Sequence, residues 1–212
     1  MNYDLESRME DNSQFLEPLS IAFVNAWNKL IRTTDENTIR HVNESVFRYF
    51  VVHELNLLHP NFHIEDEWKR IDLLLRGKDE QAAIEFKFYD SRPLNQISGT
   101  QALKGGAGER NFNEFLNSLK ILCNDLENMS WYKQQGANVT EKYFILVGTK
   151  RPANGAKGDF KAWYYPTNNI KCPENIELKK IIEFNHAVMD YEAFGWLCKV
   201  ESISIDQIAN KA

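Results

Sequence analysis

Two acidic residues and one lysine in the middle of the chain have the chemistry needed to hydrolyse a phosphodiester. Asp72 lies in one run of β-forming residues, and Glu85 and Lys87 lie in the next. The reaction needs a hard divalent cation held by oxygen atoms, an activated water, and positive charge near the transition state. The carboxylates could hold the cation together with the backbone carbonyl of Phe86, and Lys87 could orient the water or neutralise the developing charge.

A β-hairpin would bring these residues together. The segments 71–76 and 82–89 predict two strands, and the Gly-Lys-Asp-Glu sequence between them predicts a turn. With that turn, Asp72 lies directly opposite Glu85, at a Cβ separation of roughly 4.5 to 5.5 Å, which is unfavourable for two carboxylates without a cation. Because side chains alternate along a strand, Lys87 is expected on the same side as both carboxylates.

Helices are expected before the hairpin and mixed elements after it. Apolar residues at three- and four-residue spacing predict helices over 14–31 and 36–58, the second ending at His59-Pro60. A period of two then predicts a strand over 62–68. After the hairpin we expect, in order, a glycine-rich loop, a helix, a buried strand parallel to its neighbour, a basic loop and a short strand, over 90–110, 113–129, 142–147, 148–161 and 162–165.

The length of 212 residues, 43% of them apolar, predicts a single domain. We expect N-terminal helices over 14–58, a core sheet with the site over 61–165, and a C-terminal extension over 166–212, where no element is assigned after Pro173. The predicted class is α/β, with a central mixed β-sheet flanked by helices.

The segments 71–75 (IDLLL) and 83–88 (AIEFKF) resemble the Asp…Glu-x-Lys core of the PD-(D/E)XK nucleases, which have the restriction-endonuclease-like fold. The segment 43–48 (NESVFR) is similar to the family's helical glutamate, which is often a further metal or water ligand. The predicted order of elements over about 36–147 matches the family's αβββαβ core. The family's proline before the aspartate is absent, and Arg70-Ile71 stand there instead.

The resemblance implies a Mg²⁺-dependent nuclease, with Mn²⁺ as an alternative cation. Asp72, Glu85, the carbonyl of Phe86 and Glu44 would be the metal ligands, and Lys87 would complete the catalytic set. A DNA endonuclease of restriction or defence type is implied, and a homodimer with it, since two sites are needed to cut two strands. RNA is an open alternative as the substrate.

Five basic residues in the two glycine-containing loops are candidate phosphate contacts. They are Lys104, Arg110, Lys150, Arg151 and Lys157. Solvated loop charge is the alternative interpretation. The net charge of −5 argues against a protein that coats nucleic acid by electrostatics alone, although it leaves a locally basic face possible.

Composition also bears on location. No run approaches the roughly 20 apolar residues of a membrane-spanning helix, and the acidic N-terminus lacks the pattern of a secretory signal. The sequence therefore predicts a cytoplasmic protein with no membrane partner. Three widely spaced cysteines, without a Cys-x-x-Cys pair, are expected to be reduced thiols.

Other interpretations of the acidic residues remain. Asp72 and Glu85 could be ordinary strand-end carboxylates, paired with Arg70, Arg76 or Lys87 in a surface lattice. Glu36 or Glu54 could take the place of Glu44 on the helix. Glu-x-Lys also occurs at 67–69 and 177–179, so the spacing alone decides nothing. The rival functions are a catalytically inactive nuclease-like binding or regulatory subunit, and a protein-binding immunity-type module.

Overall fold

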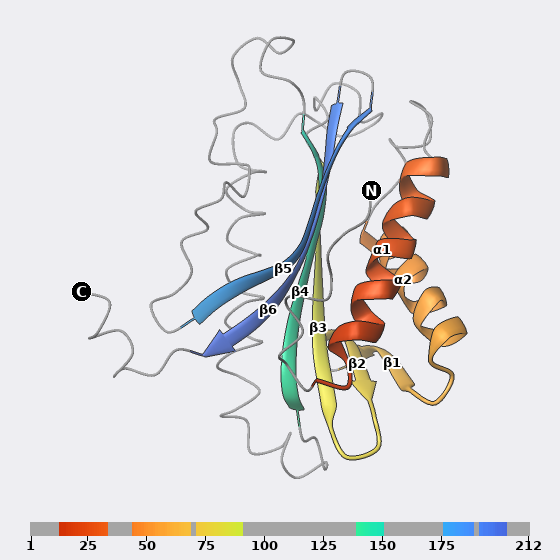
Figure 1. Cartoon of the computed structure of the whole chain (residues 1–212), viewed down its shortest axis with the longest axis vertical. Helices are drawn as coiled ribbons and strands as arrows, with labels where there is room; N and C mark the ends of the chain where they lie inside the picture. Colours follow the sequence, from red (N-terminus) through yellow and green to blue (C-terminus); the bar gives the residue numbers. More distant parts are fainter. Residues whose placement is uncertain are drawn as a thin grey trace, which may run out of the picture.

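The computed structural model describes residues 13–33, 44–68, 71–90, 139–150, 176–188 and 191–202. These residues form two helices and six strands: α1 (Leu16–Thr33), α2 (Glu44–Leu58), β1 (His63–Trp68), β2 (Ile71–Arg76), β3 (Gln81–Asp90), β4 (Val139–Lys150), β5 (Ile176–Val188) and β6 (Tyr191–Ser202). The strands form one mixed sheet in the order β1-β2-β3-β4-β6-β5, and both helices lie over one face of it (Figure 1). The α/β class with a mixed sheet is confirmed.

The hairpin β2–β3 has the predicted register. Arg76 pairs with Gln81 and Leu73 pairs with Ile84 in an antiparallel ladder, and the amide of Gly77 donates a hydrogen bond to the carbonyl of Glu80 across the turn. Strand β4 pairs with β3 in parallel, as expected for a crossover connection. The motif strands therefore lie inside the sheet, between β1 and β4.

The C-terminal part of the chain contributes to the same sheet. Strands β5 and β6 form an antiparallel hairpin, and β6 also pairs with β4. The segment 166–212, expected to be an extension with no element assigned after Pro173, thus supplies two strands of the sheet.

The expected strand end at Val147 and the basic loop from 148 are wrong at their boundary. Strand β4 continues through Lys150, because Gly148 and Thr149 pair with β3 on one side and residues 148–150 pair with β6 on the other. Pairing to a strand some 45 residues further along the sequence left no signal in the local pattern.

The hydrophobic core lies between the helices and the sheet. Phe23 and Trp27 of α1 stack on Phe184 of β5, with ring centroids 5.6 and 5.4 Å apart respectively, and Phe23 meets Phe47 of α2 edge-on. Gly195 of β6 lies beneath these rings, where an added Cβ would come within 2.8 Å of Trp27. A glycine is required there because the strand backbone approaches the indole closely.

Several expected elements lie outside the described residues. These are the start of the second helix at 36, most of the loop at 90–110, the helix at 113–129 and the strand at 162–165. The helix α2 does end at Leu58, as His59-Pro60 predicted.

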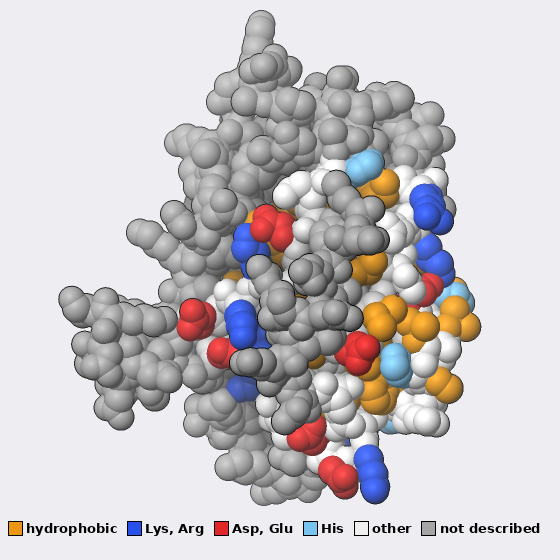
Figure 2. Space-filling view, viewed as in Figure 1, with side chains coloured by type: hydrophobic (Ala, Val, Ile, Leu, Met, Phe, Trp, Pro, Cys, Tyr) orange, Lys and Arg blue, Asp and Glu red, His pale blue; other side chains and the backbone are white. Residues whose placement is uncertain are grey.

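The outer face of α2 carries apolar side chains. Tyr49, Leu57 and Leu58 are exposed, and Tyr49 stacks on His53 one turn further along. Hydrophobic side chains gather over the helices on the right of the space-filling view (Figure 2). Even so, no helix among the described residues is long and apolar enough to cross a membrane.

Candidate active site

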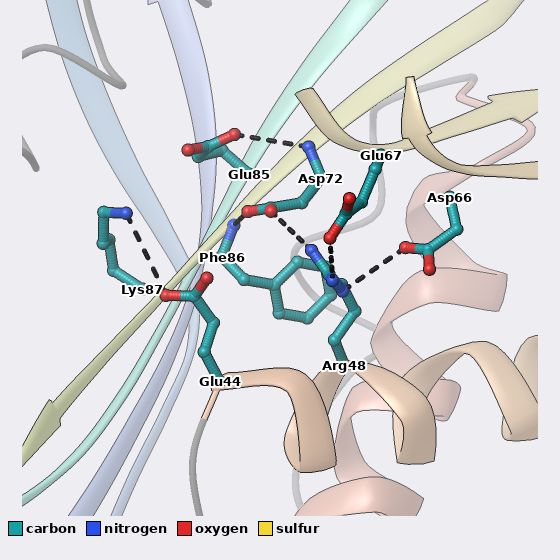
Figure 3. A network of polar contacts seen from close by, with 8 residues as sticks. All are labelled: Glu44, Arg48, Asp66, Glu67, Asp72, Glu85, Phe86 and Lys87. Carbon is teal, nitrogen blue, oxygen red and sulfur yellow. Dashed lines mark hydrogen bonds and ion pairs between the residues drawn. The ribbon is translucent and has the colours of Figure 1, made fainter. Parts of the chain in front are cut away.

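Helix α2 aims two charged residues at the motif strands. Glu44 is its first residue, and Arg48 follows one turn later on the same side. Phe47, Val51 and Leu55 are buried in the core and fix the rotation of the helix. Both charged side chains consequently project toward β2 and β3 (Figure 3).

The carboxylate of Asp72 lies between the two strands. Its Oδ2 accepts a hydrogen bond from the amide of Phe86 at 2.7 Å, and its Oδ1 accepts one from Nη1 of Arg48 at 2.5 Å. In return, the amide of Asp72 donates to Oε2 of Glu85 at 3.4 Å. Beside the regular ladder that ends at Leu73, the two strands are therefore linked through both carboxylates.

Glu85 and Lys87 complete the group on β3. Glu85 is buried at 7% exposure, and the Lys87 side chain is 21% exposed. The Nζ of Lys87 lies 4.0 Å from Oε2 of Glu44, at the N-terminal end of α2. The structure thus gathers Asp72, Glu85, Lys87 and Glu44 where α2 meets the hairpin (Figure 3).

The aromatic ring of Phe86 is buried and belongs to the hydrophobic core. Its amide is committed to Asp72. The role of its carbonyl as a metal ligand stays a prediction.

Sequence reasoning missed Arg48, which pairs with three acidic residues. Besides Asp72, its guanidinium pairs with Glu67 at 3.0 Å and with Asp66 at 3.3 Å. Glu67 has a φ of 50°, in the left-handed region that a non-glycine residue seldom adopts. Neighbouring strand residues normally face opposite sides, so this bend lets both acids reach one guanidinium. The available signal was the four-residue spacing from Glu44 to Arg48 on a predicted helix.

The electrostatics of Asp72 are unusual for a paired carboxylate. Burial raises the pKa of Asp72 above its ordinary value, and this outweighs the lowering by the Phe86 amide, Arg48 and Lys87. For Arg48, burial lowers the pKa, but the charge of Asp72 and the contacts with Glu67 and Asp66 more than offset it, so the pKa is raised. A desolvated carboxylate whose partners do not fully compensate it is typical of functional sites.

The side chains of the site offer few oxygen ligands to a hard cation. Among the described residues, no three His, Cys, Asp or Glu side chains lie close enough to hold a metal ion together. Mg²⁺ does not need three, because it commonly binds one or two carboxylates and keeps several waters. Asp72 and Glu85, linked to each other through the Asp72 amide, supply donors of that kind.

Two of the alternative pairings are excluded. Arg76 lies at the end of β2 opposite to Asp72. It pairs there with Glu65 at 2.6 Å rather than with Asp72. Glu54, a possible substitute for Glu44, is bound instead by Asn25 and Lys29 of α1.

The predicted phosphate contacts lie largely beyond this group. Lys104, Arg110, Arg151 and Lys157 are outside the described residues, and Lys150 is the last residue of β4 rather than part of a loop. Their role stays a prediction.

Comparisons of the chain with protein-family models, with curated proteins and with solved structures found no match.

Proposed function

We propose that the protein is a Mg²⁺-dependent nuclease that hydrolyses phosphodiester bonds, with DNA as its substrate class. The observation that carries the proposal is the mutual bonding of Asp72 and Glu85, each carboxylate accepting an amide of the other's strand segment, with Lys87 close by on β3. This is the residue set that the resemblance to PD-(D/E)XK nucleases singles out.

The cost of this arrangement supports a functional role. Buried carboxylates lose hydration, and an ion pair in a protein interior is often no more stabilising than apolar residues of similar volume. Asp72 and Glu85 have buried apolar neighbours on these strands, among them Leu73, Leu74 and Ile84. Selection for stability alone would favour apolar residues at these positions.

The order of the elements also supports a restriction-endonuclease-like core. Helix α2 is followed by the antiparallel strands β1, β2 and β3, and then by β4 in parallel with β3. This agrees with αβββαβ in its first helix and its four strands, and the second helix stays a prediction that lies outside the described residues. A restriction or defence role and a homodimer belong to the same proposal.

In this proposal the carboxylates of Asp72 and Glu85, with the carbonyl of Phe86, hold Mg²⁺ or Mn²⁺. When bound, the cation would polarise the phosphate and lower the pKa of a water. Lys87 places positive charge beside the carboxylates, and Glu44, at 4.0 Å, keeps the ammonium directed toward the group. Glu44 thus positions Lys87 and is a further candidate ligand.

One observation favours a second candidate, a nuclease-like subunit that binds without cutting. Both oxygens of Asp72 already accept hydrogen bonds, one from Arg48 and one from Phe86. A protein that has given up catalysis could retain this internal ion pair for structure. It would then bind nucleic acid, or a protein, without dependence on metal.

The test is cleavage of supercoiled plasmid, single-stranded DNA and single-stranded RNA in Mg²⁺ or Mn²⁺. Asp72→Asn, Glu85→Gln and Lys87→Met should each lose activity by about 100-fold or more, the scale of removing one charge-stabilising group. The matched controls are Glu177→Gln and Lys179→Met, which alter an exposed Glu-x-Lys sequence on β5 and should cut normally. No cleavage by folded wild type, with nucleic-acid binding retained in EDTA, would favour the second candidate.

A further inference from the structure

Arg48 occupies the position where a cation would be expected. Its guanidinium lies at 2.5 Å from Asp72, the carboxylate assigned to the metal, and its side chain is only 11% exposed. A guanidinium and a divalent cation cannot both lie close to one carboxylate without strong mutual repulsion. The contact is thus at odds with a fully bound metal at Asp72.

The other partners of Arg48 differ from Asp72 in their setting. The side chains of Asp66 and Glu67 are 63% and 75% exposed, whereas that of Asp72 is 17% exposed. In the close view, Asp66 and Asp72 contact the guanidinium from opposite sides (Figure 3). Solvated carboxylates on the outer side can follow a small movement of the guanidinium at low cost, and the buried one cannot.

The charges of the cluster also leave room for a second cation. Three carboxylates, those of Asp66, Glu67 and Asp72, surround the single positive charge of Arg48. Loss of the contact with Asp72 would leave Arg48 with two acidic partners. It would leave Asp72, half-buried and hydrogen-bonded to Phe86, in need of positive charge.

We propose that Arg48 competes with the divalent cation for Asp72 and is held by Asp66 and Glu67 when the cation binds. Arg48 thereby sets the cation affinity of the site. This inference rests on the proposed function, because it takes Asp72 to be a metal ligand. Arg48 then has a role in cation affinity that is separate from catalysis.

The experiment is calorimetric titration of Mn²⁺ into the protein at fixed ionic strength, without nucleic acid. Arg48→Met should bind Mn²⁺ at least about tenfold more tightly than wild type, since removing a neighbouring positive charge at a partly buried site is worth that much or more. The control is Arg76→Met, which removes another arginine paired with a carboxylate, roughly 13 Å along β2 from Asp72. It should change the affinity by less than about twofold.

A second readout separates competition from a purely structural role. Without metal, Arg48→Met should melt at a lower temperature than wild type, and Mn²⁺ should raise its melting temperature more than that of wild type. A structural role alone predicts equal shifts. If Arg48→Met does not fold, Arg48→Gln, which keeps an N–H donor for Asp72, is measured by the same criteria. Failure of both variants to fold even in excess Mn²⁺ would overturn the proposal, because a cation should replace its competitor.

The remaining outcomes distinguish this inference from the nuclease proposal. Cleavage by wild type, with Mn²⁺ affinity unchanged or weakened in Arg48→Met, would retain the nuclease and reject the competition. Tighter Mn²⁺ binding by Arg48→Met without any cleavage would retain the competition and reject the nuclease. Absence of Mn²⁺ binding in wild type and in both Arg48 variants would reject both.

Discussion

Two carboxylates form ion pairs that involve α2, the buried Glu54 and the half-buried Asp72, and they differ in how well they are satisfied. Glu54 receives hydrogen bonds from Asn25 and Lys29 of α1, and the contact with Lys29 lowers its pKa despite burial. Asp72 accepts hydrogen bonds from Arg48 and from the Phe86 amide, yet burial raises its pKa. One pair is a structural clamp between helices, and the other leaves a carboxylate whose charge is incompletely compensated.

The comparison shows that burial of a charge does not by itself mark a site. The difference lies in the partners. Lys29, which is 41% exposed, forms an ion pair with Glu54. Arg48 is instead shared among three carboxylates, those of Asp66, Glu67 and Asp72. A carboxylate that shares its cation with two others retains affinity for another cation. This imbalance is what makes the hairpin end a candidate site and the interhelical pair an ordinary one.

The largest expected effect on stability comes from removing Arg48, the positive charge at the hairpin site. Without metal, Arg48→Met should lower the free energy of unfolding by about 3–5 kcal/mol, because it removes the main positive partner of Asp72, whose side chain is only 17% exposed. Lys29→Met should cost less, about 1.5–3 kcal/mol, because Glu54 keeps the hydrogen bond from Asn25. Urea denaturation measures both. Adding Asp72→Asn to Arg48→Met should recover most of the loss, and equal costs for the two single variants would remove the distinction.

The carboxylates themselves should respond with different sign. Glu54→Gln should lower the free energy of unfolding by about 1–3 kcal/mol, because it weakens hydrogen bonds to a charged group. Asp72→Asn should leave it unchanged or raise it, since the amide avoids the cost of a desolvated charge and Arg48 keeps Asp66 and Glu67. A loss at Asp72 as large as that at Glu54 would make both pairs structural.

Local signals were sufficient to predict the hairpin half of the site. The turn at 77–80 fixes the register of β2 on β3, and the register brings Asp72 to Glu85. The role of Arg48 depends instead on where α2 lies over the sheet and on the bend at Glu67. The four-residue spacing from Glu44 shows only that Arg48 shares a helix face with it, and neither the helix position nor the bend follows from that spacing, so the main partner of Asp72 was missed.

The C-terminal strands were missed for a different physical reason. Strand β5 is an edge strand with Glu177, Lys179 and Lys180, charges that suit an exposed edge but weaken the apolar signal. Strand β6 contains Gly195, which has low strand propensity and is nevertheless required by the close approach of Trp27. Tertiary packing outweighed local propensity in both strands.

A change of pH should have smaller effects on the free energy of unfolding, to which the two carboxylates contribute with opposite sign. The pKa of Glu54 is lowered from 4.5, so its favourable contribution is complete above that value and is lost as the pH falls through the lowered pKa. The pKa of Asp72 is raised from 3.8, so its unfavourable contribution is complete above the raised pKa and vanishes below 3.8. In acid, the stability deficit of Glu54→Gln and any stability gain of Asp72→Asn should both shrink. Urea denaturation at several pH values measures this, and a deficit of Glu54→Gln that grows in acid would contradict it.

The smallest effect is expected where an ion pair is exposed. Glu183 and Lys180 lie 2.8 Å apart on β5, with side chains that are 38% and 30% exposed. Glu183→Gln should change the free energy of unfolding by less than about 1 kcal/mol, since water solvates both charges and the pair gains little over hydration. Changing the glutamate leaves Lys180 in place over the ring of Trp196, so the measurement reports the ion pair alone. A cost as large as that of Glu54→Gln would mean that burial does not account for the contrast between these pairs, and burial could then not distinguish Asp72 from an ordinary paired carboxylate.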